Sequence, residues 1–248
     1  MEPGADQRMG VVSVPEAGHP DRLRAPGRRP RVVLVDVFET ILRVSALRSR
    51  FVDVGRPEHE CELFFTRALR DGMALTLAGG VRPFADVARA ALRTTTGHSL
   101  SEDALDHVLS GFGELPPYPD VEPALQALAR ARIPAYAFTQ GSAGTARDAL
   151  DAAGLRTYLR GVLSCEEITS FKPPARVYDW ACRQVDVPGD RVALLAAHSW
   201  DVHGAVRAGL VGGLATRLEG AVPDTVVRPH VAAEHLDEVV AGLIALPA

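Results

Sequence analysis

Residues Arg31–Ile41 read RVVLVDVFETI, an apolar run that ends in a carboxylate. The segment VVLV predicts a strand buried on both faces, as in a parallel sheet covered by helices on each side. Asp36 follows this segment directly, so we expect it at the carboxyl end of the strand. Functional groups of open α/β sheets gather at that edge. The stretch therefore predicts an α/β fold with a candidate site at Asp36.

Further strands of the same kind follow along the chain, and helical stretches separate them. This alternation predicts a parallel sheet with helices on both faces. The expected helices include Val121–Ala131 and Thr145–Ala153, the latter ending at Gly154. The expected strands are Pro134–Thr139, Gly161–Ser164 and Arg191–Ala197, with the shorter run Val211–Thr216 as a possible fifth.

The segment between the first two strands has helical patterns and no convincing strand pattern. We expect residues 43–118 to form an inserted helical cap domain, on a core domain built from residues 31–42 and 119–248. Residues 1–30 are rich in Pro, Gly and Arg and are expected to be a disordered tail. The amphipathic runs of the cap are Glu60–Leu75, Phe84–Arg93 and Ser101–Phe112.

Composition excludes several classes of protein. The 248 residues carry a net charge of -4 and no basic stripe, which argues against nucleic acid as a partner. No window approaches the roughly 18 apolar residues of a membrane span, so we expect no membrane partner and a cytoplasmic protein. The cysteines Cys61, Cys165 and Cys182 are far apart and lack CxxC spacing, which argues against a disulfide framework and a structural zinc site.

Four sequence motifs carry a resemblance. They read D-V-F-E-T-I from Asp36, T-Q-G-S from Thr139, F-K-P-P-A-R-V-Y from Phe171 and A-A-H-S-W-D from Ala196. In this order they resemble the motifs of the haloacid dehalogenase superfamily. The third and fourth are most similar to those of the (S)-2-haloacid dehalogenases. The resemblance covers residues 31 to about 220 and implies a Rossmann-like core with a helical cap.

The resemblance implies a catalytic group around Asp36. Asp36 would be the nucleophile, and Lys172 would pair with it and balance its charge. Lys172 is the only lysine among 27 cationic residues, which makes a chance placement in the motif improbable. Asp201 would orient Lys172, and Thr40 would present its hydroxyl and amide to the nucleophile.

Two positions distinguish the chain from the metal-dependent phosphatases of the superfamily. Phe38 stands where those enzymes carry the second Asp of a D-x-D motif, and the fourth motif keeps Asp201 but has Ala196 before it. The hard oxygen ligands that magnesium requires are therefore missing. We expect no metal and no other cofactor, and an apolar Phe38 favours a carbon electrophile.

The resemblance also implies substrate-binding positions. Thr139 and Gln140 stand where the dehalogenases carry the Ser-Asn pair that receives the substrate carboxylate. Arg67, in the cap, fills the place of the arginine that receives the halide, with Arg70 as the alternative. The side chains that would line the site, unless they are simply core, are Tyr178 and Trp200, and Phe38 would join them.

Three positions of these motifs depart from the family pattern, and the first is Ala196, which replaces a Ser. His198 replaces an Asn, and since the chain contains no Asn at all, the change has two interpretations. It is a base near neutral pH that activates the hydrolytic water, or it fills space and forms hydrogen bonds. Glu39 replaces the usual Gly and would narrow the pocket or repel an anionic substrate.

These features predict a metal-independent hydrolytic dehalogenase of small 2-haloacids. Asp36 would form a covalent ester that water then hydrolyses. One alternative is a hydrolase of the same fold that acts on another electrophile, such as a phosphate ester. Another is a catalytically idle binding protein. The expected partner is a small-molecule substrate, with a homodimer left open.

Overall fold

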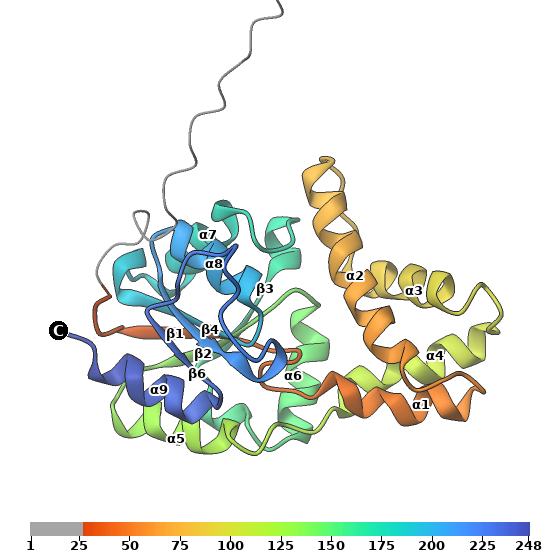
Figure 1. Cartoon of the computed structure of the whole chain (residues 1–248), viewed down its shortest axis with the longest axis horizontal. Helices are drawn as coiled ribbons and strands as arrows, with labels where there is room; N and C mark the ends of the chain where they lie inside the picture. Colours follow the sequence, from red (N-terminus) through yellow and green to blue (C-terminus); the bar gives the residue numbers. More distant parts are fainter. Residues whose placement is uncertain (1–26) are drawn as a thin grey trace, which may run out of the picture.

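The computed structural model describes residues 27–248, and a parallel sheet lies at its centre (Figure 1). Within these residues the sheet has six strands in the order β3-β2-β1-β4-β5-β6. Most of the expected tail, residues 1–30, lies outside the described residues. The strands are β1 (Val32–Asp36), β2 (Ala135–Thr139), β3 (Gly161–Ser164), β4 (Val192–Ala196), β5 (Val211–Ala215) and β6 (Val231–Ala233).

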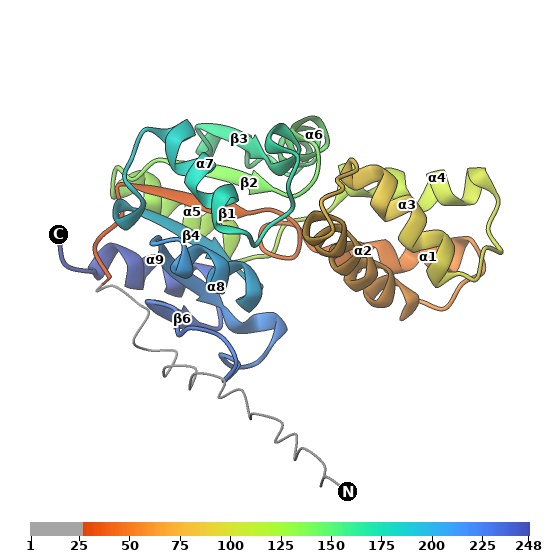
Figure 2. The same ribbon diagram turned by 90° about the horizontal axis from the view of Figure 1, so that it is seen from above.

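Helices cover both faces of this sheet (Figure 2). All of β1 is buried, and its side chains alternate between two apolar clusters because successive strand residues point to opposite faces. Val33 and Val35 pack on the face covered by α5 and α9, and Leu34 packs on the face of α7. The core helices are α5 (Val121–Arg130), α6 (Ala143–Ala152), α7 (Ala175–Val185), α8 (Ser199–Arg207) and α9 (Leu236–Ala245).

A group of helices stands beside the sheet as a separate lobe (Figures 1 and 2). Its buried face is rich in aromatic residues, including Phe51 and Phe64. The chain leaves the core and returns to it at adjacent points, where Leu42 forms a bridge with Pro117. The helices of this cap are α1 (Arg48–Asp53), α2 (Glu60–Leu77), α3 (Phe84–Thr95) and α4 (Glu102–Ser110).

The fold agrees with the expected α/β class, and the run at Val211 is the fifth strand. The sixth strand, Val231–Ala233, was not predicted because it is short and only partly buried, so it lacks the apolar pattern of the others. No helix in the described part of the chain is long and apolar enough to cross a membrane.

Candidate active site

Asp36 is the last residue of β1, and the turn that follows it holds its carboxylate in place. The hydroxyl of Thr40 donates to Asp36 Oδ2 at 2.8 Å and accepts the backbone amide of Ala197 at 2.9 Å. Because Ala197 follows β4, this relay connects the ends of two neighbouring strands. Thr40 therefore fixes the carboxylate relative to the sheet through its hydroxyl.

Lys172 reaches the same carboxylate from the loop after β3 and is fully buried. Its Nζ donates to Asp36 Oδ1 at 2.9 Å, to Asp201 Oδ2 at 2.7 Å and to the carbonyl oxygen of Phe138 at 3.0 Å. These contacts use all three ammonium hydrogens. Burial alone would lower the pKa of Lys172, but Asp201 and Asp36 raise it above its ordinary value. The side chain is therefore a fixed cation.

Asp36 is almost completely buried yet remains ionised. Burial alone would raise the pKa of the Asp36 carboxyl, but Lys172 and His198 outweigh it and hold the pKa below its ordinary range. Both oxygens of the carboxylate are engaged, Oδ1 by Lys172 and Oδ2 by Thr40. The result is an anion with little competing solvation.

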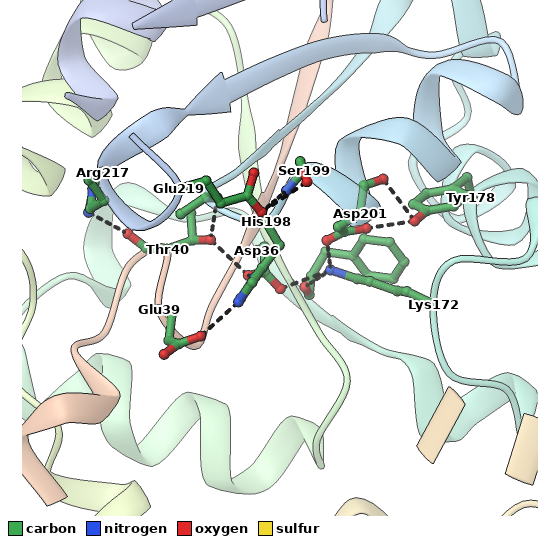
Figure 3. A network of polar contacts seen from close by, with 12 residues as sticks. Asp36, Glu39, Thr40, Lys172, Tyr178, His198, Ser199, Asp201, Arg217 and Glu219 are labelled. Atoms are coloured by element: carbon green, nitrogen blue, oxygen red, sulfur yellow. Dashed lines mark hydrogen bonds and ion pairs between the residues drawn. The ribbon is translucent and has the colours of Figure 1, made fainter. Parts of the chain in front are cut away.

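Tyr178 lies behind Asp201 and does not line a cavity among those described. Its hydroxyl is 2.6 Å from Asp201 Oδ1 and 3.0 Å from the Asp201 carbonyl oxygen (Figure 3). Of the two alternatives that the sequence leaves open for Tyr178, a residue lining the site or a core residue, this position matches the core residue, because α7 turns the ring into the core on the side of the sheet opposite α5. Tyr178 holds Asp201, which in turn holds Lys172.

Thr139 and Gln140 follow β2 beside the Lys172 segment. Thr139 accepts the backbone amide of Gly141 at 3.0 Å, and Gln140 Oε1 accepts the backbone amide of Lys172 at 2.8 Å. Gln140 Nε2 is buried and has no acceptor among residues 27–248. A buried donor left unpaired is costly, so this amide is suited to an acceptor supplied by a ligand.

His198 and Glu39, two of the three departures from the family pattern, contact each other. His198 Nε2 lies 2.8 Å from Glu39 Oε2, and His198 Nδ1 lies 3.5 Å from Asp36 Oδ2, which is an ion-pair distance and too long for a strong hydrogen bond (Figure 3). Burial alone would lower the pKa of His198, but Asp36 and Glu39 raise it to about 10. The ring is therefore an imidazolium at neutral pH.

This contact alters both expectations for the pair. An imidazolium has no lone pair, so His198 cannot act as a base near neutral pH while Asp36 is free. The charge of Glu39 is balanced by that imidazolium and does not face a substrate alone. The two residues are 159 positions apart, and nothing in the sequence pattern of either one indicates the contact.

Two cavities flank the turn that follows Asp36. One, of about 310 Å³, is largely aromatic, and Phe38, Phe84 and Phe112 form much of its wall. The other, of about 480 Å³, includes Glu39 and His198 together with one stripe of α2. Trp200 lies in this second cavity, with its ring centroid 5.2 Å from that of His198. The structure thus brings Phe38 and Trp200 to the site.

Arg67 does not reach either cavity. Its Nη1 donates to Thr95 Oγ1 at 3.1 Å, a contact between α2 and α3 inside the cap. Arg70, by contrast, lines the second cavity with His198 and Trp200. The stripe of α2 that faces this cavity is Thr66, Leu69, Arg70, Met73, Ala74 and Leu77, and Arg67 lies outside it.

Two polar residues that sequence reasoning missed support the site from the loop after β5. Arg217 Nη1 donates to the carbonyl oxygen of Thr40 at 3.2 Å, and its Nη2 pairs with Asp120 at 2.7 Å. Glu219 Oε1 accepts the amide of Ser199 at 3.1 Å, next to His198 (Figure 3). Their position just beyond a strand end is the signal that would have indicated them.

Within residues 27–248 no group of three or more His, Cys, Asp or Glu side chains is arranged to hold a metal ion. The two buried carboxylates of the site, Asp36 and Asp201, are bridged by the ammonium of Lys172. The Lys172 ammonium therefore lies between the two carboxylates and balances the charge of both.

Comparison with known proteins agrees with this geometry. The haloacid dehalogenase-like hydrolase family matches residues 30–209. The chain is 30% identical over 180 residues to (S)-2-haloacid dehalogenase 1 from Pseudomonas sp. strain CBS-3, covering 71% of this chain and 79% of that protein. It is 27% identical over 184 residues to (S)-2-haloacid dehalogenase 4A from Burkholderia cepacia, covering 72% of this chain and 80% of the other.

Solved structures share the fold. The L-2-haloacid dehalogenase from Xanthobacter autotrophicus superposes with a TM-score of 0.77 at 21% identity, over 86% of this chain and 97% of that one. The same enzyme with chloropropionic acid covalently bound superposes with a TM-score of 0.76 at 20% identity, over the same shares of the two chains. The four motifs, the sheet with its cap and the family match together show that this chain is a hydrolase and belongs to the haloacid dehalogenase-like hydrolases.

Proposed function

We propose that the enzyme removes halide from small 2-haloacids by hydrolysis, without a metal ion, through an ester on Asp36. The observation that carries this proposal is the buried Asp36 anion held by Lys172 Nζ at 2.9 Å, with Asp201 behind it. Sequence similarity to (S)-2-haloacid dehalogenases supports 2-haloacids as the substrate class. A covalent adduct in the Xanthobacter relative supports the ester route.

In the first step Asp36 attacks the carbon that bears the halogen. Oδ1 accepts one hydrogen bond, from Lys172, whereas Oδ2 accepts Thr40 and faces His198, so Oδ1 is the better nucleophile. A carbon–oxygen bond forms, and halide leaves with the electron pair of the carbon–halogen bond. Loss of the carboxylate charge is offset because the cation Lys172 keeps its second partner, Asp201.

We assign the substrate carboxylate to the donors at the end of β2, the strand that pairs with β1. Gln140 Nε2 is a buried donor without an acceptor in the described structure, and the Thr139 hydroxyl lies one residue before it. A carboxylate oxygen would satisfy the Gln140 amide. The side group of the acid would extend toward the aromatic cavity at Phe38.

In the second step water adds to the carboxyl carbon of Asp36. The bond between that carbon and the ester oxygen breaks, which releases a 2-hydroxy acid that carries away the original Asp36 oxygen. The Asp36 carboxylate is thereby restored with one oxygen from water. Covalent catalysis of this kind divides one difficult displacement into two easier steps.

Halide release from short 2-chloro and 2-bromo acids, measured with and without a chelator, tests the proposal. We expect halide release that is unaffected by EDTA. Turnover of phosphate esters that requires magnesium, with no halide release, would instead assign the enzyme to the phosphoryl-transfer alternative. No turnover of either class would favour a binding protein.

A further inference from the structure

Glu39, which is partly buried, and His198, which is buried, form a pair that faces Asp36 from the side opposite Lys172. Glu39 adopts φ 65°, a conformation that favours glycine and costs a residue with a side chain on the order of 1 kcal/mol. The strained backbone directs the Glu39 carboxylate onto His198 Nε2. His198 Nδ1, which is buried, has no hydrogen-bond partner in the described part of the chain.

The imidazole is held on its other side as well. Trp200 lies against the His198 ring, and both line the cavity of about 480 Å³ that continues along α2. With Nε2 fixed by Glu39, the remaining nitrogen, Nδ1, points toward Asp36 Oδ2 at 3.5 Å. This geometry leaves Nδ1 facing the carboxyl group that would become an ester, next to a space that can supply water.

Resting on the proposed function, we infer that Glu39 and His198 form a charge-switched base. The imidazole is a cation while Asp36 is a free carboxylate, and it becomes the base for ester hydrolysis once Asp36 is esterified. His198 is then a catalytic residue that touches the reacting water, and Glu39 is a positioning residue that acts through it.

The charges around His198 account for the switch. Asp36 of β1 and Glu39 of the following turn are the two anions that face the ring, and together they raise the pKa of His198 to about 10. Arg70 of α2 lines the same cavity, and Lys172 lies beyond Asp36. Esterification removes the Asp36 charge and leaves both cations, so the pKa of His198 falls and its Nδ1 proton is released through the cavity to solvent.

The proton balance closes over one cycle. After the proton is released, neutral His198 takes a proton from water as the water oxygen bonds to the carboxyl carbon of Asp36. The tetrahedral intermediate expels the alkoxide of the hydroxy acid, which takes the proton of the newly added hydroxyl. The site returns to carboxylate and imidazolium. Substrate and water thus give hydroxy acid, halide and one proton.

The switch itself is testable without any substrate. Asp36→Asn replaces the carboxylate by a neutral group of the same shape, as esterification does. We expect the His198 ring, followed by ¹⁵N NMR titration and assigned by its loss in His198→Gln, to titrate about three pH units lower in Asp36→Asn than in the unmodified enzyme, close to neutral pH. Asp201→Asn is the matched control, because it removes an equal charge that faces Lys172 and not His198, and it should move the midpoint far less.

Single-turnover kinetics test the role of the pair in ester hydrolysis. In Glu39→Gln the halide burst should be retained, whereas the slower second phase should fall by about 10²-fold and its pH midpoint should shift to lower pH. Glu219→Gln, which changes a charge at the same helix end, should leave that midpoint in place. A His198 midpoint equal in Asp36→Asn and the unmodified enzyme, or a second phase unaltered in Glu39→Gln, would overturn the inference. Absence of halide release from the unmodified enzyme would instead contradict the proposed function, and the titration would still decide the switch.

Discussion

Nζ of Lys172 and Oδ1 of Asp36 lie 2.9 Å apart, and both side chains are withdrawn from solvent. Removing either of two buried opposite charges leaves the other one unpaired, because no water can solvate it in place of its partner. Asp201, at 2.7 Å from the same ammonium, makes the site a buried group of two carboxylates and one cation. We therefore expect both catalysis and stability to depend on that cation.

Replacing Lys172 with Ala should abolish most activity. We expect halide release to fall by at least about 10²- to 10³-fold, since the variant loses the charge that stabilises the transition state. The pKa of Asp36 should rise, so the remaining activity should disappear at a higher pH as the solution is acidified. Circular dichroism of the variant at neutral pH serves as the check on folding, and near-normal turnover would show that this lysine is incidental.

Metal removal should have no effect. The ammonium of Lys172 already balances Asp36 and Asp201, so we expect the reaction to require no divalent cation at that position. Dialysis against EDTA followed by assay of halide release is the measurement, with added magnesium as the second arm. Activity that disappears with EDTA and returns with magnesium would contradict the proposed mechanism.

Much of the site could be predicted from the sequence because of the topology of the sheet. Asp36 and Thr40 follow β1, Lys172 follows β3, and Asp201 follows β4, so parallel strands bring them to one edge whatever the details of packing. The structure does bring these four residues together.

The rest depends on features that periodicity does not encode. The Glu39 contact with His198 requires a positive φ at Glu39 and a specific path of the loop after β4. Whether Arg67 or Arg70 faces the site depends on the rotation of α2 about its own axis, because two side chains three positions apart on a helix differ in direction by about 60°. Tyr178 likewise fits the motif in sequence while its ring packs behind Asp201.

The two arginines of α2 should behave differently. Arg70→Ala should lower kcat/KM for a 2-haloacid by about tenfold, equivalent to about 1.4 kcal/mol, because it removes the cation that lines the His198 cavity. Arg67→Ala should leave kcat/KM unchanged and lower the free energy of unfolding by about 1 kcal/mol through loss of the Thr95 contact. Steady-state kinetics and urea unfolding of both variants provide the comparison. The reverse pattern would restore Arg67 as the halide residue.

The stability of the protein should fall at alkaline pH through His198. The pKa of His198 is about 10 in the folded state, above its ordinary value of 6.5, so its stabilising charge is fully present below 6.5 and is lost as the pH rises toward 10. The free energy of unfolding, measured with urea, should be higher for the enzyme than for His198→Gln at pH 6.5. This difference should shrink by about a few kcal/mol between pH 6.5 and 10. A constant difference would mean that the folded-state pKa of His198 is not raised.

The ester on Asp36 should be visible as an isotope label in the protein. One turnover with excess enzyme in heavy-oxygen water should place the label in a peptide that contains Asp36 and leave the first hydroxy acid unlabelled, because water attacks the carboxyl carbon. Mass spectrometry of the peptide and of the product measures both. Asp36→Asn should be inactive, since a neutral amide is a poor nucleophile.

Loss of His198 should slow ester hydrolysis and leave ester formation largely intact. His198→Ala should still release one equivalent of halide and should then accumulate the Asp36 ester, which mass spectrometry detects as the added mass of the acid. Label found directly in the first product, with none in the Asp36 peptide, would show that water attacks the substrate itself. Asp36 would then be a general base, and the buried contact with Lys172 would serve to set its basicity rather than its nucleophilicity.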